Sequence, residues 1–173
     1  MIHETACVDP AAQIAEDVEI GPFSVIGPNV TIGPGCRIGP HVVLEGNTHL
    51  GREVEVFQFA SVGAPPQDKK FEGGETRLEI GDRTIIRESA TLHLGTEEGG
   101  GVTRVGADNL VMAYVHVAHD CQVGDQVVLS NAVTLAGHVE VGDHAIIGGM
   151  TAVHQFCRIG TYAFIGGASA ISK

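Results

Sequence analysis

An aliphatic residue recurs at every sixth position along most of this 173-residue chain. A strict period of six fits neither the 3.6-residue period of an α-helix nor the alternation of a hairpin protein, and it is typical of a parallel β-helix. The recurring position, which we call i, is occupied 25 times. Its residues are Val8, Ile14, Ile20, Ile26, Ile32, Ile38, Leu44, Leu50, Val56 and Val62, then Ile80, Ile86 and Leu92, then Val105, Val111, Val117, Val123, Leu129, Leu135, Val141, Ile147, Val153, Ile159, Ile165 and Ile171.

The residues around position i predict which face of each strand is buried. Position i+4 is usually small or β-branched, and it lies two residues before the next i, so both side chains share one face of a strand. That face should form a narrow aliphatic core. Cys36, Cys121 and Cys157 occupy i+4, which predicts buried core thiols. The four cysteines are widely spaced without a CxxC pair, so the sequence indicates neither a zinc knuckle nor a disulfide framework.

Two segments interrupt the repeat. Residues 64–79 place Asp68 and Gly74 where aliphatic residues belong, and residues 97–103, with three consecutive glycines, shift the phase by one. Both are predicted to project as loops, where repeat proteins often carry binding groups. We therefore expect a single all-β domain over residues 1–173 with two protruding loops.

Composition excludes some classes of partner. The formal charge is −11, with 21 acidic residues against 10 lysines and arginines, so no nucleic acid is expected as a partner. The N-terminus carries no signal-peptide pattern, and no stretch approaches the roughly 20 apolar residues that span a bilayer. The sequence predicts a soluble, cytoplasmic protein without membrane insertion.

Histidines gather on one face if three hexads make one coil. Residues 18 apart then stack at about the 4.8 Å spacing between strands. This places His119 beneath Gly137 and Asp120 beneath His138. The same surface also receives His93, His116, His154 and Gln155.

Such a cluster suits acid–base chemistry. His119 could take a hydroxyl proton, Asp120 could fix its tautomer, and the N–H of Gly137 could meet an oxyanion. A zinc site like that of the trimeric β-helix carbonic anhydrases is the rival. It needs three histidines, with two of them four residues apart. His116 and His119 do not have that spacing, so no metal is predicted. A non-catalytic β-helix scaffold would explain the repeats but not the stacked histidines.

Several motifs resemble those of a known enzyme family, the UDP-N-acetylglucosamine O-acyltransferases of lipid A biosynthesis. The resemblance covers the whole chain and rests chiefly on the combination of three runs: His116-Val117-Ala118-His119-Asp120, Ala136-Gly137-His138, and Gly148-Gly149-Met150-Thr151-Ala152-Val153-His154-Gln155-Phe156. Two further runs are similar, Gln67-Asp68-Lys69-Lys70 and Ile86-Arg87-Glu88-Ser89-Ala90-Thr91-Leu92-His93.

This resemblance implies a left-handed β-helix of about eight coils that forms a homotrimer with active sites between subunits. It implies transfer of a (3R)-3-hydroxyacyl group from acyl carrier protein to the sugar 3-hydroxyl. His119 would be the general base, Asp120 its partner and Gly137 the oxyanion donor. The substrate-binding residues implied are Gln67, Asp68, Lys70, His93, His116, His138, His154 and Gln155, and Gly167 would set acyl-chain length.

One departure and one alternative accompany this resemblance. The family usually continues into a C-terminal helical domain, which we expect to be absent because the chain stops at Lys173. The related N-acyltransferases act on a UDP-amino sugar and carry an N-terminal uridine-binding domain. Here the repeats already begin at Val8, which favours the O-acyltransferases.

Overall fold

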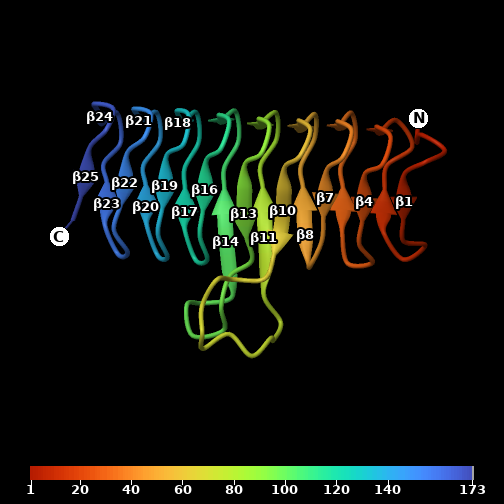
Figure 1. The fold of residues 1–173 in the computed structure, drawn as a ribbon, viewed down its shortest axis with the longest axis horizontal. Coiled ribbons are helices and arrows are strands. Elements are labelled where there is room, and N and C mark those ends of the chain that lie inside the picture. The colour runs from red at the N-terminus through yellow and green to blue at the C-terminus, as the bar shows by residue number, and fades with distance from the viewer. Residues whose placement is uncertain (173) are drawn as a thin grey trace.

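The computed structural model describes residues 1–172, which wind into a parallel β-helix of 25 short strands (Figure 1). The described residues include no helix that is long and apolar enough to cross a membrane. The strands are β1 (Cys7–Val8), β2 (Gln13–Ile14), β3 (Glu19–Ile20), β4 (Val25–Ile26), β5 (Thr31–Ile32), β6 (Arg37–Ile38), β7 (Val43–Leu44), β8 (Thr48–Leu50), β9 (Glu55–Val56), β10 (Ser61–Ala64), β11 (Arg77–Ile80), β12 (Ile85–Ile86), β13 (Thr91–His93), β14 (Val102–Val105), β15 (Leu110–Val111), β16 (His116–Val117), β17 (Gln122–Val123), β18 (Val128–Leu129), β19 (Thr134–Leu135), β20 (Glu140–Val141), β21 (Ile146–Ile147), β22 (Ala152–Val153), β23 (Arg158–Ile159), β24 (Phe164–Ile165) and β25 (Ala170–Ile171).

The strands form three parallel sheets, one on each side of a triangular coil. Sheet A runs β24-β21-β18-β15-β12-β9-β6-β3, sheet B runs β1-β4-β7-β10-β13-β16-β19-β22-β25, and sheet C runs β2-β5-β8-β11-β14-β17-β20-β23. Each strand pairs with the third strand along the chain, as His116 does with Thr134. The coils stack along one axis, with the two termini at opposite ends (Figure 1).

The core consists of the aliphatic residues at positions i and i+4, as the six-residue period predicted. Every one of the 25 residues at position i lies in a strand. Those of the middle coils are buried, and the i+4 residues, such as Val42 and Val139, are fully buried beside them. Cys36, Cys121 and Cys157 are buried, and all four cysteines are free thiols. The predicted core and its thiols are confirmed.

The corners of the coil have an unexpected backbone conformation. Within residues 1–172, all 17 non-glycine residues with positive φ stand at position i+3, including Asp120 (61°), His138 (62°) and Phe156 (62°). This conformation costs an L-residue roughly 1–2 kcal/mol. Because the turn repeats in every coil, corner side chains stack on their neighbours. At the A–B corner the rings of Phe23, His41 and Phe59 stack in this way, with centroids 5.1 and 5.4 Å apart.

Two loops leave the helix at the corner between sheets B and C. One joins β10 to β11 over residues 65–76, and the other joins β13 to β14 over residues 94–101. They hang below the coils in Figure 1, in yellow and green. Their stems are held together, because Arg77 donates a backbone hydrogen bond to the carbonyl of Gly101 (2.8 Å) and Gly95 donates one to that of Arg77 (3.2 Å).

Candidate active site

His119 and Asp120 form a hydrogen-bonded pair in the turn that follows β16. Nδ1 of His119 lies 2.8 Å from Oδ2 of Asp120, and the two side chains are 16% and 1% exposed. A carboxylate can only accept at this contact, so it favours the tautomer with the proton on Nδ1. Nε2 of His119 makes no hydrogen bond within residues 1–172. The pair therefore presents a nitrogen with a free lone pair.

Gly137 lies over His119, as the 18-residue stacking predicts. The next residue, His138, donates its backbone N–H to the carbonyl of His119 at 3.0 Å, which fixes the two coils in register. The backbone N–H of Gly137 has no acceptor in the part of the chain that the structure describes. A free N–H thus lies on the coil next to the imidazole.

His138 and Phe156 extend the same corner by two coils. The ring of His138 meets that of His119 edge-on, with centroids 5.1 Å apart and planes at 89°. Phe156 stacks on His138 at 4.4 Å and 9°. Nε2 of His138 is 3.8 Å from Oδ2 of Asp120. Stacking of the i+3 residues accounts for the contacts of His138 with Phe156 and Asp120, and His119 meets the same stack from position i+2.

Two further histidines lie on sheet B beside this corner. The ring of His93 meets that of His116 edge-on at 4.8 Å, and Nδ1 of His116 lies 2.7 Å from Oγ1 of Thr91. His93 is 4% exposed, and its Nδ1 has no partner among the described residues. Burial lowers the pKa of His93 to about 4, with smaller contributions from His116 and His119. Burial also lowers the pKa of His116, so both imidazoles are neutral near pH 7.

A cavity of about 720 Å³ connects the pair to both loops. The first loop contributes Gln67, Asp68 and Lys70, and the second contributes Thr96, Glu98 and Gly99. Its remaining lining residues are His119, His138, Gln155 and Phe156. The structure thus brings five predicted substrate-binding residues to the cavity that His119 lines, namely Gln67, Asp68, Lys70, His138 and Gln155.

Other predicted site residues do not line this cavity. His154 is exposed on the coil beyond, with Nδ1 3.3 Å from the carbonyl of Gln155. Gly167 lies between β24 and β25, at the A–B corner rather than the B–C corner that carries His119. His93 and His116 flank the cavity on sheet B without lining it. A single chain therefore assembles only part of the expected set.

The residues that fix Asp120 were missed by sequence reasoning. Thr96 donates its backbone N–H to Oδ1 of Asp120 (2.9 Å) and its hydroxyl to Oδ2 (2.6 Å). The backbone N–H of Asp120 donates to Oγ1 of Thr103 at 2.8 Å. Both threonines lie around the loop that shifts the phase, where stacking arithmetic fails. Phe156, by contrast, is 18 residues from His138 and could have been found by the same arithmetic.

One group of side chains offers ligands for a metal ion. His119, Asp120 and His138 each present one ligand atom, all within 4.8 Å of one another. This group contains two histidines and one carboxylate rather than three histidines. However, Oδ2 of Asp120 already receives the hydroxyl of Thr96 and faces Nδ1 of His119, both at hydrogen-bonding distance. With the backbone N–H of Thr96 on Oδ1, three hydrogen bonds engage this carboxylate, as expected for a residue that orients His119.

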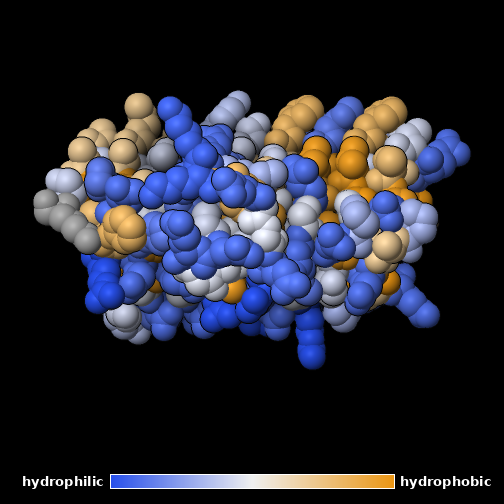
Figure 2. Space-filling view, turned by 90° about the horizontal axis from the view of Figure 1, so that it is seen from below, coloured by the Kyte–Doolittle hydropathy of each residue, from blue (hydrophilic) through white to orange (hydrophobic). Residues whose placement is uncertain are grey.

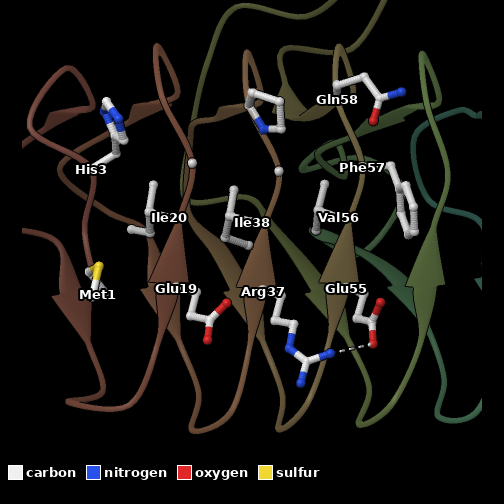
Figure 3. A pocket seen from close by; sticks show the side chains of 13 residues that line it. Met1, His3, Glu19, Ile20, Arg37, Ile38, Glu55, Val56, Phe57 and Gln58 are labelled. Carbon is white, nitrogen blue, oxygen red and sulfur yellow. Dashed lines mark ion pairs between the residues drawn. The ribbon is translucent and has the colours of Figure 1, made fainter.

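A second hollow, of about 560 Å³, lies on sheet A near the N-terminus (Figure 3). Met1 and His3 lie at one end and Phe57 and Gln58 at the other, and Figure 3 shows the ion pair of Arg37 with Glu55 (3.6 Å) along one side. None of its lining residues belongs to the coils of the His119–Asp120 pair. It is a feature of the outer surface of sheet A.

Comparisons with known proteins agree with the fold and the repeats. A family model described as bacterial transferase hexapeptide (six repeats) matches residues 11–46 and 103–137. A curated relative from Herminiimonas arsenicoxydans, an acyl-[acyl-carrier-protein]–UDP-N-acetylglucosamine O-acyltransferase, is 56% identical over 138 residues, which are 80% of this chain and 53% of the relative. A relative of the same name from Janthinobacterium is equally similar. The chain spans about half the length of these relatives.

Two solved structures extend the match over nearly the whole chain. LpxA from Acinetobacter baumannii superposes with a TM-score of 0.97 at 53% identity, covering 99% of this chain and 67% of that one. The UDP-N-acetylglucosamine acyltransferase of Francisella novicida superposes with a TM-score of 0.98 at 46% identity, covering 100% and 63%. The fold and repeats therefore define a hexapeptide-repeat transferase with a left-handed parallel β-helix. The chain belongs to the family of acyl-[acyl-carrier-protein]–UDP-N-acetylglucosamine O-acyltransferases.

Proposed function

We propose that this chain transfers a (3R)-3-hydroxyacyl group from acyl carrier protein to the 3-hydroxyl of UDP-N-acetylglucosamine, the first step of lipid A biosynthesis. One observation carries the proposal: the His119–Asp120 pair presents a free Nε2 at a cavity shared with both loops. The names of the 56% identical relatives describe those proteins as acyl-[acyl-carrier-protein]–UDP-N-acetylglucosamine O-acyltransferases, which supports the proposal.

The proposed reaction follows from the proton positions at His119. Asp120 accepts a hydrogen bond from the N–H at Nδ1, so Nε2 can take the proton of the sugar hydroxyl as its oxygen attacks the thioester carbonyl carbon. A carbon–oxygen bond forms. When the tetrahedral intermediate collapses, the carbon–sulfur bond breaks and the carrier thiolate leaves with the proton held on His119. Positioned acid–base catalysis of this kind contributes about 10² to 10⁴-fold.

The remaining polar groups are assigned to charge stabilisation and substrate binding. The free N–H of Gly137 would hold the oxyanion of the intermediate. Asp68 and Lys70 on the first loop would contact the sugar and the acyl 3-hydroxyl, and both share the cavity with His119. The nucleotide-sugar would also meet Gln67, His93, His116, His138, His154 and Gln155.

The proposed assembly is a homotrimer, which would complete the site from a neighbouring subunit. The outer residues of sheet C form ion pairs, such as Arg104 with Glu79 (2.6 Å) and Arg158 with Glu140 (3.0 Å), and suit solvent. The C-terminal half of sheet A instead presents an apolar row: Ile85, Leu110, Val128, Ile146 and Phe164. Phe164 is 75% exposed in the single chain. An uncovered apolar row of this kind marks a contact surface.

Further apolar groups support the same surface. The A–B corner exposes large side chains, namely Phe23, Phe59, Tyr114 and Met150. Apolar side chains also gather at the N-terminal end of the face in Figure 2, at the upper right. If sheet A of one subunit packs on sheet B of the next, the contact is heterologous, and a rotation of one third of a turn closes it as a ring. His93 and His116 on sheet B would then lie against the neighbour.

A cytoplasmic location is part of the proposal. All four cysteines are free thiols, including the exposed Cys7, which fits a reducing compartment. We also propose that acyl carrier protein is the partner that supplies the acyl group, and that the reaction uses no cofactor.

The test is an acyl-transfer assay with two acceptors. Purified chain is given a 3-hydroxyacyl carrier protein with either UDP-N-acetylglucosamine or a UDP-sugar whose acceptor group is an amine. We expect transfer to the hydroxyl acceptor, and loss of nearly all turnover in His119→Ala with the fold intact. Transfer only to the amine would favour the N-acyltransferases. Transfer to neither acceptor would indicate a scaffold, and ordinary rates in His119→Ala would show that His119 is not the base.

A further inference from the structure

One residue of the second loop, Thr96, forms hydrogen bonds with the carboxylate of Asp120. Thr96 supplies a donor to each oxygen, its backbone N–H to Oδ1 at 2.9 Å and its hydroxyl to Oδ2 at 2.6 Å. Thr96 is 7% exposed and Asp120 4%, so both groups are removed from solvent. The hydrogen bonds link a loop residue to a corner residue 24 positions later.

The direction of the hydroxyl proton at Thr96 is also determined. Gly99 donates its backbone N–H to Oγ1 of Thr96 at 3.1 Å. That oxygen therefore acts as an acceptor toward Gly99 and turns its own proton toward Asp120. Both oxygens of Asp120 receive donors, an arrangement that suits an ionised carboxylate. Oδ2 then faces Nδ1 of His119 with its position already fixed.

Two further contacts close this arrangement. The backbone N–H of Asp120 donates to Oγ1 of Thr103, which is fully buried. A Cβ built on Gly99 would lie 2.1 Å from Cγ of Asp120. Real contacts of this type are never so short, so only glycine lets the loop close over the carboxylate.

We propose that Thr96 is a positioning residue of the reaction, which acts through Asp120 by holding its carboxylate in the one orientation that keeps the proton of His119 on Nδ1. The proposal deepens the proposed function, on which it rests. It explains why the repeat is interrupted after β13: the excursion carries a threonine and a glycine to a corner that a regular coil would leave open. Glu98 and Gly99 of the same loop line the cavity with Asp68 and Lys70.

Removal of the hydroxyl separates this role from simple packing. Thr96→Val keeps the branched shape but removes the hydroxyl donor to Oδ2 of Asp120. The N–H of Gly99 keeps the backbone carbonyl of Thr96 as an acceptor at 3.1 Å. Thr96→Ser keeps the hydroxyl and loses only a methyl group. Thr31→Val on sheet C is the matched control, because Thr31 makes no side-chain hydrogen bond among the described residues.

The first measurement needs no substrate. In the full chain labelled with ¹⁵N-histidine, the ring nitrogens of neutral His119, assigned by their loss in His119→Ala, report which nitrogen carries the proton. We expect the Nδ1–H tautomer in the parent, in Thr96→Ser and in Thr31→Val, and a mixture of tautomers in Thr96→Val. The second measurement is kcat, which should fall roughly tenfold or more in Thr96→Val with little change in KM.

The outcomes are distinct. A Thr96→Val protein with the parental tautomer and kcat overturns the proposal, as does a Thr96→Ser protein as impaired as Thr96→Val. If Thr96→Val does not fold, Gly99→Ala pushes on the same carboxylate and should give the same change of tautomer; an unchanged tautomer there contradicts the proposal. If the parent shows no transfer while the tautomer still depends on Thr96, the proposed function fails and the positioning role stands.

Discussion

A Cβ on Gly137 would lie 2.6 Å from Cε1 and 2.8 Å from Nε2 of the His119 ring. Non-bonded carbon atoms pack at about 3.5–4.0 Å. No side chain therefore fits at this position without moving the ring. The glycine lets the imidazole lie directly against the next coil and keeps a free N–H beside the nitrogen proposed to take the proton.

Gly137→Ala should therefore displace His119 and lower kcat by about 10²-fold, the cost of losing one oxyanion donor or its alignment. Circular dichroism should show the same β-helix, since the change affects one turn. Gly160→Ala is the matched control, because a Cβ there meets nothing within 4 Å. Parental kcat in Gly137→Ala would mean that the ring tolerates displacement and that the assigned geometry is not the reactive one.

Metal removal is expected to leave turnover unchanged. Both oxygens of Asp120 already accept hydrogen bonds from Thr96, so a metal ion at His119, Asp120 and His138 would compete with these hydrogen bonds for the carboxylate. Turnover should be the same before and after dialysis against a chelator, and added zinc should not raise it. A metal bound at one ion per chain and required for activity would instead favour the carbonic anhydrase type of site.

Stability should fall in mild acid because of His93. The pKa of His93 is about 4 in the folded chain, against 6.5 for an ordinary histidine. Between these pH values the unfolded chain binds a proton at His93 and the folded chain does not, so acid favours the unfolded chain. The stabilisation is complete above about pH 6.5 and is lost as the pH falls toward 4, by up to about 3 kcal/mol. Urea unfolding at a series of pH values measures it.

His93→Gln should flatten this dependence, and His3→Gln, at an exposed position, should not. His116, whose pKa is also lowered, leaves a residual slope in His93→Gln. An equal slope in the parent and in His93→Gln would place the source of acid sensitivity elsewhere.

The sequence predicted those parts of the fold that depend on period alone. The hexads from Val105 to Ile171 are unbroken, so residues that stack on neighbouring coils are always 18 positions apart in this part of the chain. His119 therefore meets Gly137, and Asp120 meets His138. Where a loop intervenes, the offset changes. Thr91 lies opposite His116 at a separation of 25 residues, and Thr96 reaches Asp120 at 24.

The corner conformation could not be predicted from residue type. Phe, Tyr and Met rarely adopt positive φ, yet Phe156, Tyr114 and Met150 all do so here. The repeating coil imposes this conformation because its strands on either side are already paired. Local preference is overridden, and the stack of Asp120, His138 and Phe156 follows from the turn rather than from the side chains.

Association should depend on the apolar row of sheet A. Light scattering at micromolar concentration is expected to show three chains for the parent. Phe164→Glu would place a charge in the proposed contact and lose the burial of a large aromatic ring, worth about 1.5–3 kcal/mol, so it should shift the chain toward monomer. Gln122→Glu on sheet C, also an outward strand position, is the control. A monomeric parent would move the site to a groove of one chain.

Acyl-chain length is expected to depend on Gly167, which the family resemblance places near the far end of the acyl channel. A glycine leaves that end open, so a long 3-hydroxyacyl chain should be preferred. Each further buried methylene is worth about 0.8 kcal/mol, and two of them favour the longer donor by roughly tenfold. Gly167→Met should block the tail and reverse the preference.

A Cβ at this position would lie 3.0 Å from the carbonyl oxygen of Gly149, so any side chain presses slightly on the neighbouring coil. Gly167→Ala is therefore the control, because it creates the same contact without filling the channel. The measurement is a competition between ten-carbon and fourteen-carbon 3-hydroxyacyl carrier proteins on the three proteins. Equal selectivity in the parent and in Gly167→Met would show that this residue does not set the length, and a shift in Gly167→Ala as large as that in Gly167→Met would trace the effect to the coil contact.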